Sequence, residues 1–184
     1  MKIFVAIFVL IFSLLFISCS KSQDLQIKQP NSTPVLEMST ELVGLWEVSG
    51  EMLDFRLYDN GLVEFDTLDN SKKDPKKTMY KTDDLKVRKQ GYINDAKVEK
   101  ILNLLKSDNF SELKETYKAK RAGIDNSINN TIVFQSQNQK KTIRIWGHLE
   151  NLSNPKPENF PDFPAVLSDL YKETSKIKSQ LSKE

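Results

Sequence analysis

The chain begins with a continuous apolar stretch and then changes to short runs in which apolar and polar residues alternate. Residues 3–17 are apolar apart from Ser13, and residues 20–41 are rich in Ser, Gln, Asn, Thr and Pro with no helical or strand period. A short apolar segment after one lysine, followed by a small residue, is typical of an export signal. The pattern therefore predicts a signal segment over residues 1–18, a flexible tether over residues 19–41 and one folded domain over residues 42–181.

The first clear strand pair is predicted in LDFRLYDNGLVEFDT, residues 53–67. A three-residue turn over residues 59–61 pairs Leu57 with Val63 and Arg56 with Glu64, so apolar side chains share one face and charged ones share the other. A two-residue loop would pair Leu57 with Glu64 and mix the faces. We therefore expect Gly61 to take the left-handed conformation that ends this type of turn.

A second hairpin is predicted in NTIVFQSQNQKKTIRIWG, residues 130–147. Pairing Ile132 with Ile145 and Phe134 with Ile143 leaves an even-length loop centred on residues 138–139. The same alternation places four other residues on the opposite face, namely Thr131, Val133, Arg144 and Trp146.

Two helices complete the predicted domain. Asn94 or Asp95 caps a helix whose apolar residues recur at helical spacing, and a second helix begins near Asp162 and Pro164 and continues through Ile177. Strands, a helix, a hairpin and a last helix, without strict alternation of strand and helix, indicate the α+β class. We expect an antiparallel sheet of five or six strands with two helices packed on one face.

Composition excludes several functions. The net charge of +2 over 184 residues is too small for a nucleic-acid partner, which needs a strongly basic face. With one cysteine and one histidine, no zinc site of the Cys and His type can form, and no nucleotide-binding or hydrolase motif occurs. Asp83 and Asp84 are adjacent on a predicted strand edge and would point to opposite faces. We therefore expect no enzyme activity, no metal and no cofactor.

The only cysteine, Cys19, lies where the apolar segment ends. The sequence FISC, residues 16–19, resembles the lipobox of bacterial lipoproteins, with Ser18 before the cysteine and Phe16 where leucine is usual. The resemblance implies that Cys19 becomes the diacylglyceryl-modified first residue of the mature protein. Its partner would then be a bacterial membrane, the outer membrane rather than the inner one.

Other roles for Cys19 fit the sequence less well. A disulfide would have to join two chains, because the sequence has no second cysteine. A catalytic thiol would need a nearby base, yet the only histidine lies beyond the tether. An uncleaved signal helix that buries Cys19 stays open as an alternative.

Two further resemblances concern the domain. The stretches FRLYDNGLVEF and DNFSELKETY resemble uncharacterised bacterial lipoprotein domains of the α+β class, which have no known activity to transfer. The stretch LVGLWEVSG resembles the start of lipocalin-like barrels, and this implies a small-ligand binder as an alternative. A closed barrel of that kind needs about eight strands, more than the pattern predicts.

One loop carries the residues that best suit binding. Trp146 and His148 precede a proline-rich stretch over residues 155–164, and Phe160 and Phe163 lie within it. Aromatic side chains on a stiff loop bury much area at low entropic cost. We expect these four residues either to form a binding surface for a protein or small molecule, or to pack back onto the sheet. The leading hypothesis is a lipid-anchored cell-envelope protein that acts by binding or scaffolding.

Overall fold

The computed structural model describes residues 33–44, 47–119, 126–136, 139–147, 160 and 162–183. These residues belong to one compact unit that spans Ser32–Glu184 and has the α+β fold. The strands are β1 (Pro34–Gly44), β2 (Val48–Tyr58), β3 (Leu62–Leu68), β4 (Tyr80–Lys81), β5 (Lys86–Tyr92), β6 (Thr116–Lys118), β7 (Asn126–Gln135) and β8 (Lys140–Trp146). The helices are α2 (Thr82–Leu85), α3 (Asp95–Leu105), α4 (Asp108–Ser111) and α5 (Ala165–Leu181), with a 3-10 turn over Asn70–Lys72.

The sheet is larger than the sequence predicted and is not purely antiparallel. Its strand order is β5-β3-β2-β1-β7-β8-β6, and β4 pairs with β2 beside this path. β6 runs parallel to β8, and β4 runs parallel to β2. Both strands are two or three residues long, so neither has an alternation long enough to be recognised in the sequence.

The first hairpin confirms the predicted register. Leu57 pairs with Val63 and Arg56 with Glu64, and the turn contains three residues. Gly61 has a φ of 80°, and a Cβ at this position would lie 2.7 Å from the Ile93 carbonyl oxygen. Both the backbone conformation and the close contact therefore require glycine.

The register predicted for the second hairpin is wrong by two residues. Ile132 pairs with Ile143, and Phe134 pairs with Lys141, so the connection spans residues 136–139. A shift of two residues keeps every side chain on its predicted face, and the hydrophobic pattern cannot distinguish the two registers. The four residues predicted to lie opposite the core do so.

The folded domain begins earlier than predicted. Residues 34–41, which were assigned to the tether, form most of β1, and β1 is the central strand between β2 and β7. Leu36 and Met38 are buried on the helix side of the sheet, while Glu37 and Ser39 alternate with them. Thr40 is polar but also buried, so it interrupts the apolar alternation by which a strand is recognised in the sequence.

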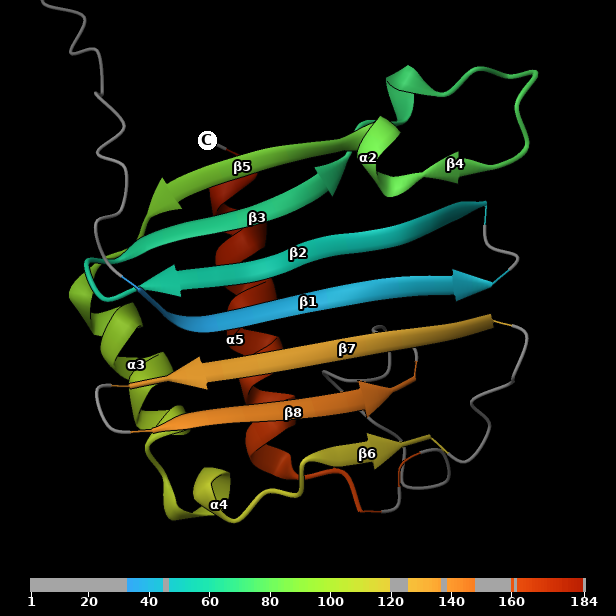
Figure 1. Cartoon of the computed structure of the whole chain (residues 1–184). Coiled ribbons are helices and arrows are strands. Elements are labelled where there is room, and N and C mark those ends of the chain that lie inside the picture. The colour runs from blue at the N-terminus through green and yellow to red at the C-terminus, as the bar shows by residue number, and fades with distance from the viewer. Residues whose placement is uncertain are drawn as a thin grey trace, which may run out of the picture. The chain divides into compact units, whose positions relative to one another are not determined.

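The helices pack on one face of the sheet. α5 crosses behind the strands in Figure 1, with α3 and α4 on the same side. α3 begins after the predicted cap Asn94, whose side chain accepts a hydrogen bond from the Lys97 amide at 3.1 Å. The cap of α5 is Pro164 rather than Asp162. One core contains buried residues from α3, α4, α5 and six of the strands.

Asp83 and Asp84 do not lie on a strand. They occupy the single turn of α2, where the carboxylate of Asp84 accepts a hydrogen bond from the Lys81 amide at 3.3 Å. Both are exposed. The strand was expected because Leu85 and Val87 alternate, but Leu85 belongs to α2 and packs in a small separate cluster with Val48 and Tyr80.

Candidate functional site

Phe160 and Phe163 pack against the core, where Phe160 is buried and Phe163 is half-buried. Phe160 is buried, and its ring centroid lies 5.3 Å from that of Phe163, which in turn lies 6.1 Å from that of Tyr117. A Cβ on Gly147 would lie 2.4 Å from the Phe160 ring, so glycine lets this ring close over the end of β8. The contacts of these two residues are those of the alternative in which they pack back onto the sheet.

Trp146 lies on the other face of the sheet. In β8, Ile143 and Ile145 are fully buried on the helix side, so Arg144 and Trp146 alternate with them and point away from the helices. Trp146 is half-buried and Arg144 is exposed. The predicted binding surface is therefore divided between two faces, and His148 and Cys19 fall outside the described residues.

We call the face of the sheet opposite the helices the open face; it is turned toward the viewer in Figure 1. The strand pairing identifies the neighbours of Trp146 on this face. Trp146 lies between Lys118 of β6 and Asn129 of β7. Arg144 lies between Thr116 and Thr131 in the adjacent row. We name this group the indole patch; it comprises Thr116, Lys118, Asn129, Thr131, Arg144 and Trp146.

The polar groups of the indole patch are incompletely matched. Neither Arg144 nor Lys118 forms an ion pair with any described residue, although the Lys118 ammonium lies 5.7 Å from the centroid of the indole ring. Asn129 donates to the Glu41 carboxylate at 3.1 Å, while its Oδ1 is buried without a partner in the described part of the chain. Buried acceptors are normally satisfied, so this one marks the patch as unusual.

Both arginines in the other half of the open face are paired with carboxylates. Arg56 donates to Glu37 at 2.8 Å and to Glu64 at 3.1 Å, and Arg88 donates to Asp66 at 2.5 Å. We name these five residues the ion-pair network; it lies on β1, β2, β3 and β5. Four of the five, all except Glu64, line a depression of about 200 Å³ together with neighbouring side chains.

Asp66 anchors the ion-pair network. Its side chain is buried, and besides Arg88 it accepts a hydrogen bond from the Leu53 amide at 2.9 Å. Burial disfavours the charged carboxylate, but the hydrogen bonds from Arg88 and Leu53 outweigh burial, and the pKa of Asp66 is lowered. Asp66 therefore stabilises the sheet near the irregularity between β1 and β2.

Three polar side chains, Asp54 of β2, Thr40 of β1 and Asn130 of β7, form a connected chain on the helix side of the sheet. The amide nitrogen of Asn130 donates to the carbonyl oxygens of Ile145 at 3.3 Å and Gly147 at 3.1 Å, so its Oδ1 must face the Thr40 hydroxyl at 2.9 Å. The hydroxyl has one proton to donate and also contacts the Asp54 carboxyl. All three groups are satisfied when Asp54 is protonated and donates to Thr40. Burial raises the pKa of Asp54, against the charge of Lys178.

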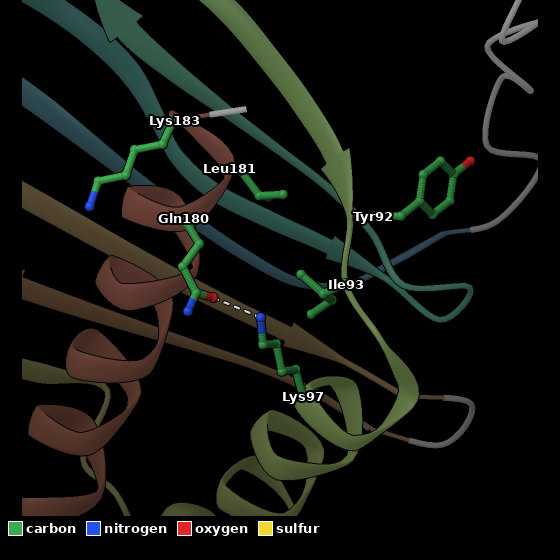
Figure 2. A pocket seen from close by; sticks show the side chains of 6 residues that line it. All are labelled: Tyr92, Ile93, Lys97, Gln180, Leu181 and Lys183. Atoms are coloured by element: carbon green, nitrogen blue, oxygen red, sulfur yellow. Dashed lines mark hydrogen bonds between the residues drawn. The ribbon is translucent and has the colours of Figure 1, made fainter.

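A pocket of about 430 Å³ lies where α5 ends beside β5 and α3 (Figure 2). Lys97 donates to the side chain of Gln180 at 2.7 Å, and Tyr92 and Lys183 point away from the centre on opposite sides. A Cβ on Gly91 would lie 2.7 Å from Leu181, so glycine allows the helix to approach the strand. The lysines lie at the C-terminal end of α5, where cations stabilise the helix dipole. This pocket is a gap left where α5, β5 and α3 pack together.

The described residues contain no group of three or more His, Cys, Asp or Glu side chains that could hold a metal ion. None of the described helices is long and apolar enough to cross a membrane. Comparison with protein-family models finds no match to the chain, and comparison with curated proteins finds none either. The indole patch is the arrangement within the described residues that best suits a binding partner. Sequence reasoning placed Trp146, Arg144 and Thr131 on one face, but it missed Lys118 because β6 pairs with β8 in parallel.

Proposed function

We propose that the chain is an exported cell-envelope protein, anchored through lipid on Cys19, whose domain binds a partner through the indole patch. The anchor rests on the lipobox-like sequence FISC and the short apolar segment before it. Each acyl CH₂ inserted in a bilayer contributes about 0.8 kcal/mol, so several chains on one residue hold firmly. The domain then needs no membrane-binding surface and can present its open face to a partner.

The observation that carries the binding role is the contrast within one sheet face. The arginines on β2 and β5 are paired with carboxylates, whereas Arg144 and Lys118 beside Trp146 have no ion-pair partner within the described residues. Exposed aromatic and arginine side chains are enriched at the energetic centres of interfaces. A surface that served only to stay soluble would not need the indole.

Two measurements test the two parts of this proposal. The intact mass of the mature protein should correspond to cleavage before Cys19 plus acyl chains, and Cys19→Ala should abolish this product. Because the lipid would occupy the only native cysteine, a new cysteine provides a single free thiol. Thr116→Cys, an exposed position in the indole patch, should react with a maleimide several-fold more slowly in cells than in the purified protein.

The matched control is Gln90→Cys, which is exposed on the same face beside the ion-pair network. It should react equally in cells and in the purified protein. Equal reactivity of Thr116→Cys in cells and in the purified protein would contradict binding at the indole patch. A mass that shows neither cleavage before Cys19 nor added acyl chains would contradict the anchor.

The lipocalin-like alternative has no supporting observation in the described residues. The strand path ends at β5 on one side and at β6 on the other, and these two strands do not pair with each other in the described part of the sheet. α5 packs on the face of the sheet where a barrel would hold its ligand, and it buries Leu167, Leu170 and Ile177 there. We therefore propose a surface-binding domain and not a barrel that encloses its ligand.

A further inference from the structure

We infer that the partner of the indole patch is an acidic polysaccharide, a sugar chain that carries carboxylate groups. This inference rests on the proposed function and specifies its ligand. Three properties of the patch lead to it: its charge, the type of hydrogen-bonding groups that it presents, and its flat aromatic side chain.

The charge of the patch selects an anion. Arg144 is exposed and has no carboxylate partner among the described residues, and Lys118 stands two strand positions further along β6 from Thr116, on the same face. Neighbouring strands lie about 4.8 Å apart, so the two cations are close enough to meet one carboxylate-bearing unit. A guanidinium offers two parallel N–H donors that match the geometry of a carboxylate.

The hydrogen-bonding groups of the patch favour a sugar over a peptide. β8 pairs on both sides, with β7 and β6, and β7 pairs on both sides, with β1 and β8. Their backbone groups are used within the sheet, so a peptide could add as an extra strand only along the outer edge of β6, which is three residues long. The face presents side chains only. Thr116 and Thr131 flank Arg144, and neither hydroxyl makes a hydrogen bond to another described residue.

A chain of sugar hydroxyls is complementary to such a surface. Each sugar hydroxyl both donates and accepts, as the threonine hydroxyls do, so sugar hydroxyls can pair with those of Thr116 and Thr131. The exposed part of the Trp146 indole, beside the Lys118 ammonium that lies 5.7 Å from the ring centroid, supplies a rigid apolar surface for the C–H face of a sugar ring, at low cost in side-chain entropy. One row of the patch then provides cation, indole and amide in sequence across three strands.

The test uses the full chain in detergent with Trp46→Phe, because the sequence contains two tryptophans and this variant leaves Trp146 as the sole indole. Titration with polygalacturonate should change the indole fluorescence in a saturable manner, and neutral dextran should leave it unchanged. Arg144→Gln should weaken polygalacturonate binding about tenfold, the expected loss for one charge-assisted contact. Arg88→Gln, the matched arginine of the ion-pair network, should leave the affinity unchanged.

Isothermal titration calorimetry of the wild-type chain with polygalacturonate provides the same result without Trp46→Phe, should that variant fold poorly. Equal affinity for polyglutamate would overturn the sugar inference and indicate an acidic protein partner. Absence of polygalacturonate binding would also overturn it. If Thr116→Cys remains protected in cells while polygalacturonate does not bind, the ligand class is wrong and the proposed function stands. If Thr116→Cys is not protected, the proposed function itself fails.

Discussion

The two halves of the open sheet face use charge in opposite ways. On β2, β3 and β5, Arg56 and Arg88 are each held by carboxylates, and the most buried of these, Asp66, also fixes a backbone amide. On β8 and β6, Arg144 and Lys118 have no such partners within the described residues, and they flank a half-buried indole. Similar residues on one surface therefore serve stability in one half and remain available in the other.

The paired and the unpaired arginines also differ in what binding a ligand would cost. Arginines that are already paired need a carboxylate to be displaced before they bind a ligand, whereas unpaired ones pay only their own desolvation. The two halves should therefore respond in opposite ways to mutation. Changes in the ion-pair network should lower stability and spare binding, and changes in the indole patch should lower binding and spare stability.

The largest loss of stability should follow removal of Asp66. Asp66→Ala leaves the Leu53 amide and the Arg88 guanidinium without their acceptor, and a buried unmatched donor costs about 1–3 kcal/mol. We expect the free energy of unfolding to fall by about 3 kcal/mol in urea denaturation. Glu41→Ala, an exposed acid of β1 on the same face, is the control and should change it by less than about 0.5 kcal/mol. A loss of similar size in both variants would contradict the special role of Asp66.

The buried chain beneath β1 should give the next largest effect. Thr40→Val keeps the shape of the side chain but leaves Asp54 and the Oδ1 of Asn130 without their shared hydroxyl. We expect a loss of about 2 kcal/mol in the same urea measurement. No loss would show that the hydroxyl does not link β1, β2 and β7.

Protonation of Asp54 also predicts a pH dependence. The folded pKa of Asp54 is raised above its ordinary value of 3.8, so between 3.8 and the folded pKa the folded chain binds more protons than the unfolded chain. This contribution to stability is complete below 3.8 and is lost as pH rises through the folded pKa. Asp54→Asn can donate to Thr40 at every pH, and should remove this part of the decline when unfolding is measured from pH 4 to pH 8. An unchanged pH profile would indicate that Asp54 is ionised.

The smallest stability effects should separate the two arginines. Arg88→Gln loses its ion pair with Asp66, at a cost of about 1 kcal/mol since the Arg88 side chain is partly exposed. Arg144→Gln loses no ion pair to a described residue and should change the free energy of unfolding by less than about 0.5 kcal/mol. A larger loss for Arg144→Gln than for Arg88→Gln would show that the indole patch serves stability.

The hydrophobic pattern predicted the strand register correctly where an error of one residue would have moved side chains to the wrong face of the sheet. Leu57 and Val63 fixed the first hairpin in this way, together with the left-handed Gly61. The second hairpin slipped by two residues because that shift leaves the faces unchanged. β1 was missed because the inward Thr40 belongs to a polar chain that only Asp54 and Asn130, distant in sequence, make favourable.

The candidate site was predictable only in part, for a related reason. Alternation along β8 placed Arg144 and Trp146 together on the face opposite the core. Lys118 joins them through a parallel pairing between distant segments, which no local pattern encodes. Phe160 and Phe163 had the composition of a binding loop, but burial of Phe160 against Gly147 depends on tertiary packing.

The binding role of the indole patch is tested most directly by thiol reactivity in cells that express Thr116→Cys together with a second substitution. Arg144→Gln should weaken binding of the partner and raise the maleimide reaction rate of Thr116→Cys toward that of the purified protein. Arg88→Gln should leave the thiol protected, because the Arg88 guanidinium is already paired with the Asp66 carboxylate. Equal protection in both double variants would contradict binding through the indole patch.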